Sequence, residues 1–505
     1  MKPSLKVLCA ALTLILLLPG CASEDLPEEE DTTLLPAESV LEEDEDRSPL
    51  PELLSLPYDP ALALDPVTCP EGMQQTIGSL LYEGLFRLDE HFQPQPWLCE
   101  TFTYDAETFR YTFTLRSGVT FSDGVPLTGA DVKATLDRAR TSPRYSQRLS
   151  AVTSVLASEN TITVTLSRPN AAFPALMDIP IVKQGTENTA APIGTGPYFF
   201  SLEENGAHLI ASQSWWRGES QPTDRIALVE ADGHDAMLYR FTSRDVQLIA
   251  ADFTGAQSVS VTGDMELHDA ATTIMQYVGI NTAHLSESAL RQALWLGIDR
   301  KNITNAYLSG HAAAAQFPVS PASSLYPREM ESSFSINALK DALTQCAQLP
   351  QQPLTLLVNE ENSFRVSVAQ SIAATYTAAG LAVEVQVLPW EDYLTALERG
   401  EFDLYYGEVR LTADWDLHAL LSSAGSLNYG RWSNEETDRL LELYAHTGES
   451  ATMAELCAHL KEAAPILPVC FKAVSILTQP DIFYGLSPTA AEPFYDLSNI
   501  HVQLK

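Results

Sequence analysis

The spacing of hydrophobic and polar residues predicts a β-rich region early in the folded part of the chain. Between residues 97 and 121, apolar and polar side chains alternate, which is the period of half-buried strands in a meander. Residues 152–166 alternate in the same way around a polar turn and predict a hairpin. Between these segments, Thr128 and Asp131 have the spacing of a capping box, which predicts the start of a helix.

Further along the chain the pattern changes twice. Residues 199–275 alternate short strands and turns, whereas the spacing from Ser286 onward is that of an amphipathic helix. From Pro353 the order becomes strand, helix, strand. The predicted strands are residues 354–358, 383–387 and 402–406. Parallel β-α-β units place ligand loops beyond the carboxyl ends of their strands, so residues 359–361 and 407–417 are candidate ligand loops.

The N-terminus has the pattern of an exported lipoprotein. Lys2 and Lys6 precede an apolar run of twelve residues, which is too short to cross a bilayer comfortably. The run leads to Pro19-Gly20-Cys21, so residues 1–20 are predicted to be a signal peptide and Cys21 to be its lipidation site. The alternative is an ordinary signal peptide followed by an incidental cysteine.

Acidic residues dominate the charge of the chain, both in one N-terminal segment and overall. Positions 22–46 contain twelve acidic residues and no basic residue. The segment 21–48 is therefore predicted to be a disordered linker that holds the folded body away from a surface. A metal-binding role for this acidic run is the less favoured alternative. The whole chain has 30 basic and 66 acidic residues, a net charge of −36, which argues against nucleic acid as a partner.

No motif for catalysis or for a resident metal stands out. The chain has no nucleophile-elbow, zinc-protease or phosphate-loop motif, and its ten histidines lack metal-ligand spacing. Five cysteines remain after Cys21, of which Cys69 and Cys99 are either a disulfide pair or small buried side chains. We therefore predict neither a cofactor nor an enzyme, with an exported hydrolase as the disfavoured alternative.

Several short segments, in order along the chain, resemble the signatures of one known family. They lie at residues 81–85, 111–128 with 131–132, 194–198, 290–294 with 298–301, and 400–404. The chain resembles the family 5 extracellular solute-binding proteins, the peptide/nickel-type receptors of ABC importers, over about residues 60–475. The segment 111–128 is the most specific match.

The resemblance implies an α/β, periplasmic-binding-protein-like fold in three domains: two mixed α/β lobes around a hinged cleft, plus an inserted β-rich domain. Lobe I would be discontinuous, domain II would be the insertion, and lobe II would be domain III. The implied boundaries are 49–82 with 192–275 and 476–505 for lobe I, 83–191 for domain II, and 276–475 for lobe II. The glycine-rich segment 193–198 is interpreted as a hinge or domain crossing.

The resemblance also implies a ligand site in the loop after a strand of lobe II. Peptide receptors of this kind hold the ammonium group of the ligand with an aspartate, and Asp414 occupies that place, with Asp416 as a competitor. A surface turn or a helix cap is the structural alternative for Asp414. Arg410 either grips a ligand carboxylate or neutralises Glu408. Trp415 is a candidate for stacking on ligand side chains.

Asn428 and Tyr429 complete the set of candidate ligand-binding residues, because they fall in a loop beyond the strands of lobe II. The implied function is capture of a small solute, most often a short peptide, and its delivery to an ABC permease by a monomeric, lipid-anchored, extracytoplasmic protein. A sensor or adhesin without a transport role would use the same cleft and stays open as an alternative.

Overall fold

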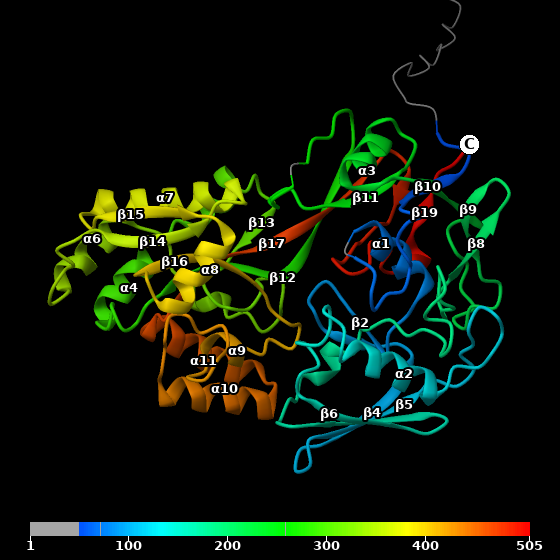
Figure 1. The fold of residues 1–505 in the computed structure, drawn as a ribbon, viewed down its shortest axis with the longest axis horizontal. Coiled ribbons are helices and arrows are strands. Elements are labelled where there is room, and N and C mark those ends of the chain that lie inside the picture. The colour runs from blue at the N-terminus through cyan, green and yellow to red at the C-terminus, as the bar shows by residue number, and fades with distance from the viewer. Residues whose placement is uncertain (1–49, 71, 258) are drawn as a thin grey trace, which may run out of the picture. The chain divides into compact units, whose positions relative to one another are not determined.

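The computed structural model of the protein describes residues 50–70, 72–257 and 259–505 (Figure 1). The predicted signal peptide 1–20, the linker 21–48 and the lipidation site Cys21 lie outside these residues. Among the described residues, no helix is both long enough and apolar enough to cross a membrane.

A four-stranded sheet joins segments that are far apart in the sequence. Its order is β1 (Leu54–Tyr58), β10 (Arg225–Glu230), β9 (Gly206–Ala211) and β8 (Tyr198–Glu203), and only the pairing of β1 with β10 is parallel. Helix α1 (Met73–Leu81) buries Ile77, Leu80 and Leu81 in the core of this sheet. The sheet is therefore built from residues on both sides of the segment 83–191.

The segment 83–191 forms its own antiparallel sheet. The order is β4 (Cys99–Asp105), β5 (Arg110–Leu115), β7 (Thr161–Leu166) and β6 (Val152–Ala157), which confirms the predicted hairpin and two strands of the predicted meander. The end of the predicted meander, residues 119–121, forms no strand but only an isolated bridge between Thr120 and Pro126. Helix α2 (Gly129–Ala139) covers it and begins at the predicted capping box. There the Thr128 backbone N–H and hydroxyl both donate to Oδ2 of Asp131, at 3.0 and 2.7 Å. Two short strands, β2 (Phe86–Leu88) and β3 (Pro94–Pro96), pair beside this sheet.

The third sheet has seven strands and contains the predicted β-α-β units. Its main order is β11 (Leu248–Ala251), β17 (Ile466–Thr478), β12 (Glu266–Ile280), β16 (Leu404–Arg410), β14 (Leu354–Asn359) and β15 (Val383–Leu388). Strand β13 (Ala312–Ala314) pairs with β17. Strands β14, β15 and β16 are mutually parallel where they pair, and α7 (Ser363–Ala379) and α8 (Trp390–Arg399) connect them. The parallel unit predicted from residue 353 onward is confirmed.

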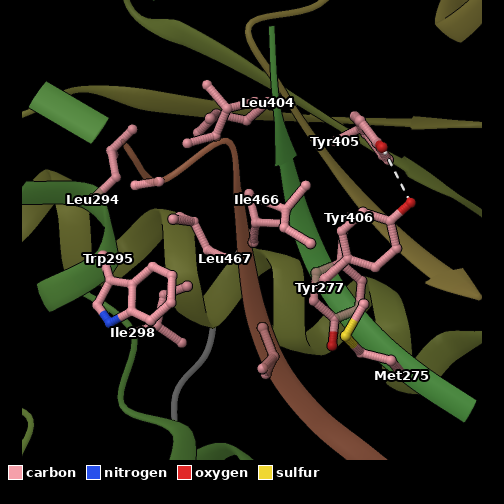
Figure 2. Close-up of a cluster of buried hydrophobic side chains, with 14 of the residues drawn as sticks. Met275, Tyr277, Leu294, Trp295, Ile298, Leu404, Tyr405, Tyr406, Ile466 and Leu467 are labelled. Atoms are coloured by element: carbon pink, nitrogen blue, oxygen red, sulfur yellow. Dashed lines mark hydrogen bonds between the residues drawn. The ribbon is translucent and has the colours of Figure 1, made fainter. Parts of the chain in front are cut away.

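Helices enclose the core around this sheet. They are α4 (Ser288–Leu296), α5 (Arg300–Asn302), α6 (Ile336–Gln345), α9 (His418–Leu421), α10 (Glu435–Thr447) and α11 (Ser450–Ala463). Figure 2 shows side chains of α4 and of strands β12, β16 and β17 meeting in this core. Tyr277 and Tyr405 lie there with their hydroxyl oxygens 3.1 Å apart, so that even the polar ends of these two rings have a partner.

Strands β12 and β17 connect two parts of the fold (Figure 1). At the C-terminal end of β17, residues 475–478 pair with β11. At its N-terminal end, residues 466–471 pair with β12, and this part of β12 also pairs with β16 on its other side. Both strands run across the lobe boundaries implied at 275/276 and 475/476. The exact domain boundaries stay a prediction, but these two strands are the physical crossing between the segments assigned to the two lobes.

One element in the middle of the chain was not predicted. Residues 199–275 contain helix α3 (Gly233–Thr242) as well as strands. Only three of its apolar side chains, Met237, Leu238 and Phe241, are buried, so its helical period is too short to stand out from the surrounding strand pattern. Cys69, Cys99, Cys346, Cys457 and Cys470 are free thiols, and all but Cys346 are buried.

Close backbone contact ties the insertion to the first sheet. A Cβ atom added at Gly194 would lie 2.0 Å from the carbonyl oxygen of Leu81, and one added at Gly196 would lie 2.6 Å from that of Leu80. Glycine is therefore required where this crossing passes the end of α1. Next to it, the buried Glu83 accepts hydrogen bonds from four groups in both regions: the indoles of Trp97, Trp215 and Trp216, and the hydroxyl of Thr195.

Candidate functional site

A cavity of about 1260 Å³ lies where the three sheet-containing regions meet. Its walls come from α1 and the loop before it, from the insertion around residues 144–151 and 168–180, and from the loop after β16. Strands β12 and β17 contribute residues 269–274 and 472–474. The volume exceeds the roughly 300–1,000 Å³ of common small-molecule pockets, so the space suits a larger solute such as a short peptide.

Asp414 forms part of the cavity wall and is held in place by three donors. Strand β16 ends at Arg410, and the turn that follows carries Asp414, which is only 2% exposed. Its carboxylate accepts hydrogen bonds from Nδ2 of Asn170 at 2.8 Å, from the hydroxyl of Thr412, and from the backbone N–H of Asp416 at 3.3 Å. Among the described residues, no cationic side chain forms a salt bridge with it.

Burial raises the pKa of Asp414, and the nearby carboxylate of Asp416 adds to the increase. Its three neighbouring donors favour the ionised form but do not reverse this effect. The charge of Arg148 also interacts with Asp414, although the two side chains form no salt bridge. A positive ligand group in direct contact with Asp414 would add a close ion pair in a place where water screens little. The structural alternative of an exposed surface turn is excluded by the burial of the side chain.

Asp416 lies two residues away and, unlike Asp414, has a cationic side chain in direct contact. Arg168 forms a salt bridge with its Oδ2, and Nδ1 of His418 lies 2.6 Å from its Oδ1. Although burial opposes ionisation, hydrogen bonds from His418 and Arg168 lower the pKa of Asp416. Asp416 lines the cavity, yet its charge is already compensated by the protein itself, which leaves Asp414 as the better ligand anchor.

Arg410 lies at the end of β16, is exposed, and lines the same cavity. Glu408, the carboxylate that it was expected to neutralise as an alternative, is contacted instead by Arg365 at 2.7 Å and by Lys472 at 3.7 Å. Three of the predicted residues, Asp414, Asp416 and Arg410, are thus brought together at one wall of the cavity.

Trp415, Asn428 and Tyr429 have other surroundings. Trp415 is 1% exposed and packs edge-to-face on Phe92 and Phe471, with ring centroids 5.3 and 6.0 Å away. It adopts a φ of 55°, an uncommon backbone conformation for a large residue, so its buried ring fixes the turn that presents Asp414. Asn428 hydrogen-bonds within its own loop.

Tyr429 packs against Tyr405 with ring centroids 6.2 Å apart. Within the described part of the chain, the residues that line the cavity do not include Trp415, Asn428 or Tyr429. Ligand contact by these three residues stays a prediction, and their positions lend it no support.

Sequence reasoning missed the part of the site that comes from the insertion. Arg168 and Asn170 follow strand β7 and reach Asp416 and Asp414, which lie almost 250 residues further along the chain. The backbone N–H of Ala171 also donates to the carbonyl of Ala445 at 2.8 Å in the same place. Polar residues after a hairpin carry no local signal for this role, because a turn and a ligand wall use the same residue types.

The described residues contain no cluster of three or more His, Cys, Asp or Glu side chains placed to hold a metal ion. The carboxylate and guanidinium groups that line the cavity can bind a ligand by charge and by hydrogen bonds.

Comparison with known proteins gives a consistent family. The family model described as bacterial extracellular solute-binding proteins, family 5 Middle, matches residues 93–428. The glutathione-binding protein GsiB of Escherichia coli (strain K12) is 22% identical over 423 residues, which cover 78% of this chain and 83% of that protein.

Solved structures show the same fold. The unliganded open form of MppA, a periplasmic murein tripeptide binding protein, has a TM-score of 0.74 at 19% identity, covering 90% of this chain and 97% of that one. The oligopeptide-binding protein AppA from Bacillus subtilis, in complex with a nonapeptide, has a TM-score of 0.60 at 19% identity, covering 90% and 100%. The predicted periplasmic-binding-protein-like fold class is confirmed.

Proposed function

Because the chain belongs to the bacterial extracellular solute-binding proteins of family 5, the extracytoplasmic receptors of ABC importers, we propose that it captures short peptides by their free ammonium group. The ammonium group binds at Asp414, inside the cavity described above. The loaded protein then delivers the peptide to a membrane permease, working as a monomer that is anchored through a lipid on Cys21.

The observation that carries this proposal is the electrostatic state of Asp414. The side chain is buried at a cavity wall, its hydrogen-bond donors are neutral, and burial raises its pKa. A buried carboxylate without a salt-bridged cation is unfavourable for the empty protein, and an ammonium group in direct contact relieves that cost. A perturbed pKa in a cavity is a recognised mark of a functional residue.

The names of relatives support a peptide-like ligand. GsiB is named for glutathione, MppA for a murein tripeptide, and AppA was solved with a nonapeptide. Other structures of the same fold are named for nickel transport, so the peptide class rests on the buried Asp414, which forms no salt bridge within the described residues. The three-domain division implied by the sequence remains part of the proposal, with ligand binding between lobe I, domain II and lobe II.

Thermal and urea unfolding with defined peptide mixtures test the proposal. A mixture of free peptides two to six residues long is expected to stabilise the protein, by about 2.7 kcal/mol when a ligand is present at 100 times its dissociation constant. The same mixture with acetylated N-termini is expected to have no effect, because acetylation removes the positive charge.

Asp414→Asn is the key variant and Asp341→Asn is its matched control. Asn at position 414 keeps the shape but removes the charge, so binding of free peptides is expected to weaken by about 30-fold or more, roughly 2 kcal/mol. Asp341 is exposed on helix α6, and its substitution is expected to leave binding unchanged. Equal stabilisation by free and acetylated peptides would show that Asp414 is not an ammonium site.

A further inference from the structure

Two loops of the insertion contact the turn that carries Asp414. One loop is residues 89–93, between β2 and β3, and the other is residues 168–171, after β7. Both loops contribute to the cavity wall, although they lie far apart in the sequence. We call these two loops together the clasp, because each of them connects the insertion to the segment assigned to lobe II.

The first loop is anchored in lobe II by one buried aromatic ring. Phe92 is 9% exposed and belongs to the core around the seven-stranded sheet, not to the core of the insertion from which it comes. Its ring packs edge-to-face on Trp415. Phe92 has a φ of 61°, which is uncommon for a bulky residue. The loop keeps this shape because Oδ1 of Asp89 accepts hydrogen bonds from the backbone N–H groups of His91 and Gln93, both at 2.9 Å.

Polar contacts of the same loop add to this anchor. Nδ1 of His91 lies 2.9 Å from the carbonyl oxygen of Ala322, and Nε2 of Gln93 donates to the hydroxyl of Ser324 at 3.1 Å. Both partners lie in lobe II, between β13 and α6. Because hydrogen bonds are directional, these contacts fix the position of the loop, while the aromatic ring supplies buried apolar surface.

The second loop contacts lobe II through polar groups alone. Besides the bonds to the two carboxylates described above, the backbone N–H of Ala171 donates to the carbonyl of Ala445 in helix α10 at 2.8 Å. On the insertion side, the hydroxyl of Tyr111 lies 2.8 and 3.0 Å from the carbonyl oxygens of Asn170 and Ala171. The second loop is therefore held by the insertion sheet while its other groups reach lobe II.

Each contact of the clasp joins two groups of this chain, so that forming it requires no group from a ligand. The two loops also share one target, because the first packs on Trp415 and the second binds the carboxylates on either side of it. We propose that the clasp keeps the Asp414 turn docked on the insertion before a ligand binds, and that release of the clasp limits how fast a ligand enters and leaves the cavity.

The consequence is a binding-competent form that is only a minor population. A ligand that enters through the released form associates at a rate that scales with that population. The inference goes beyond the proposed function, since it concerns contacts within the chain whatever the ligand is.

Hydrogen exchange of the full chain without peptide tests the clasp directly. The acceptor of the Ala171 backbone N–H is Ala445 in lobe II, so exchange of this amide reports release of the clasp. We expect it to exchange at least about 10-fold more slowly than an unprotected amide, as measured by mass spectrometry at single-residue resolution. Exchange at the unprotected rate would overturn the inference.

Phe92→Ala and Arg168→Gln are the two clasp variants. Each is expected to speed exchange of the Ala171 amide by about 10-fold or more, the first by loss of apolar burial and the second by loss of an ion pair. Phe92→Ala is the more informative change, because Phe92 lies in the other loop from Ala171. An unchanged Ala171 rate in this variant would show that the loops act independently, which contradicts the proposal.

Leu156→Ala and Arg110→Gln are the matched controls on the insertion. Both side chains are exposed and lie outside the cavity wall, so exchange at Ala171 is expected to stay unchanged. The amides of strand β5, which pair within the insertion sheet, report whether the insertion stays folded. If β5 also loses protection in Phe92→Ala, the milder Phe92→Leu gives the same comparison with the insertion intact.

Binding kinetics of a peptide ligand distinguish the clasp from closure around the ligand alone. In Phe92→Ala, the association and dissociation rates from stopped-flow are both expected to rise by about 10-fold, because release becomes more frequent with and without ligand. Faster dissociation with unchanged association would refute the clasp, since contacts that form only around a ligand affect only its departure. If no peptide binds, the proposed function fails, and the Ala171 exchange rate still decides whether the clasp exists.

Discussion

Asp414 and Asp416 are two carboxylates in one turn whose acid–base properties differ because their neighbours differ. Asp414 receives only neutral donors and is buried, which raises its pKa. Asp416 is compensated by Arg168 and His418, which lower its pKa against the effect of burial. The two carboxylates thus have different roles: Asp416 holds the insertion against the turn through its ion pair with Arg168, and Asp414, which has no salt bridge, remains available to a ligand.

This difference predicts how Asp414 affects stability as a function of pH. Because its native pKa is raised, the native state holds this proton more tightly than the unfolded state does. Above about pH 4 the carboxyl ionises in the unfolded state but keeps its proton in the native state. As pH rises from there to the raised native pKa, the free energy of unfolding of the wild-type protein therefore falls relative to that of Asp414→Asn. Each tenfold change in the acid constant is worth about 1.4 kcal/mol.

Urea unfolding of the two proteins without peptide, between about pH 4 and pH 7, measures this effect. The difference in unfolding free energy is expected to shift in favour of the Asn variant as pH rises. If the variant also loses a hydrogen bond, this lowers its unfolding free energy by the same amount at every pH and does not change how the difference depends on pH. Parallel pH curves for the two proteins would contradict the raised pKa.

Among the elements, the crossing between the insertion and the first sheet leaves no room for a side chain at its glycines. Gly194 and Gly196 pass the end of α1 so closely that a methyl group would overlap backbone atoms, which cannot move away as a side chain tip can. The buried Glu83 completes this junction through its four donors. The junction is therefore expected to hold α1, which lines the cavity, in a fixed position.

Two glycine substitutions near this junction are expected to have opposite effects. Gly194→Ala would place a Cβ atom 2.0 Å from the Leu81 carbonyl oxygen and is expected to destabilise the protein by about 2 kcal/mol or more. Gly78→Ala, inside α1, meets only the Tyr82 ring at 3.7 Å and is expected to stabilise it by about 0.5–1 kcal/mol. Chemical denaturation checks both, and equal effects would contradict the contact geometry.

For the whole molecule, charge is the dominant property. A net charge of −36 creates a negative potential that attracts cationic solutes and repels anionic ones over distances set by salt. Asp414 acts inside this general field, so the net charge governs how fast a ligand arrives, while the cavity decides how tightly it is bound.

The association rate of peptides is therefore expected to depend on salt concentration. Whether the rate falls or rises with added salt is set by the charge of the peptide. A peptide with an added lysine is expected to bind several-fold more slowly when ionic strength rises from about 0.01 M to about 0.1 M, since the screening length falls from about 30 to about 10 Å. A glutamate-containing peptide of the same length is expected to bind faster at the higher salt. Stopped-flow kinetics measure both, and identical salt dependence would rule out long-range steering.

The sequence alone determined the elements and the family. Alternation in 97–121 and 152–166, the Thr128–Asp131 capping box and the β-α-β order after residue 353 depend on neighbours in the chain. The structure confirms them except at residues 119–121, which form only an isolated bridge. The β-α-β order indicated the loop 407–417, and the resemblance to the family indicated Asp414 within it. Helix α3 was missed because only three buried positions mark its period.

Tertiary structure decided which of the candidate residues share the cavity. It brought Asn170 and Arg168 from the insertion to Asp414 and Asp416, and it placed Trp415 in the core as a support for the turn. It also brought α1 and residues 144–151 to the same cavity. These relations join positions tens to hundreds of residues apart. Burial, and with it the pKa of each carboxyl, exists only after folding, because it depends on what surrounds a side chain in space.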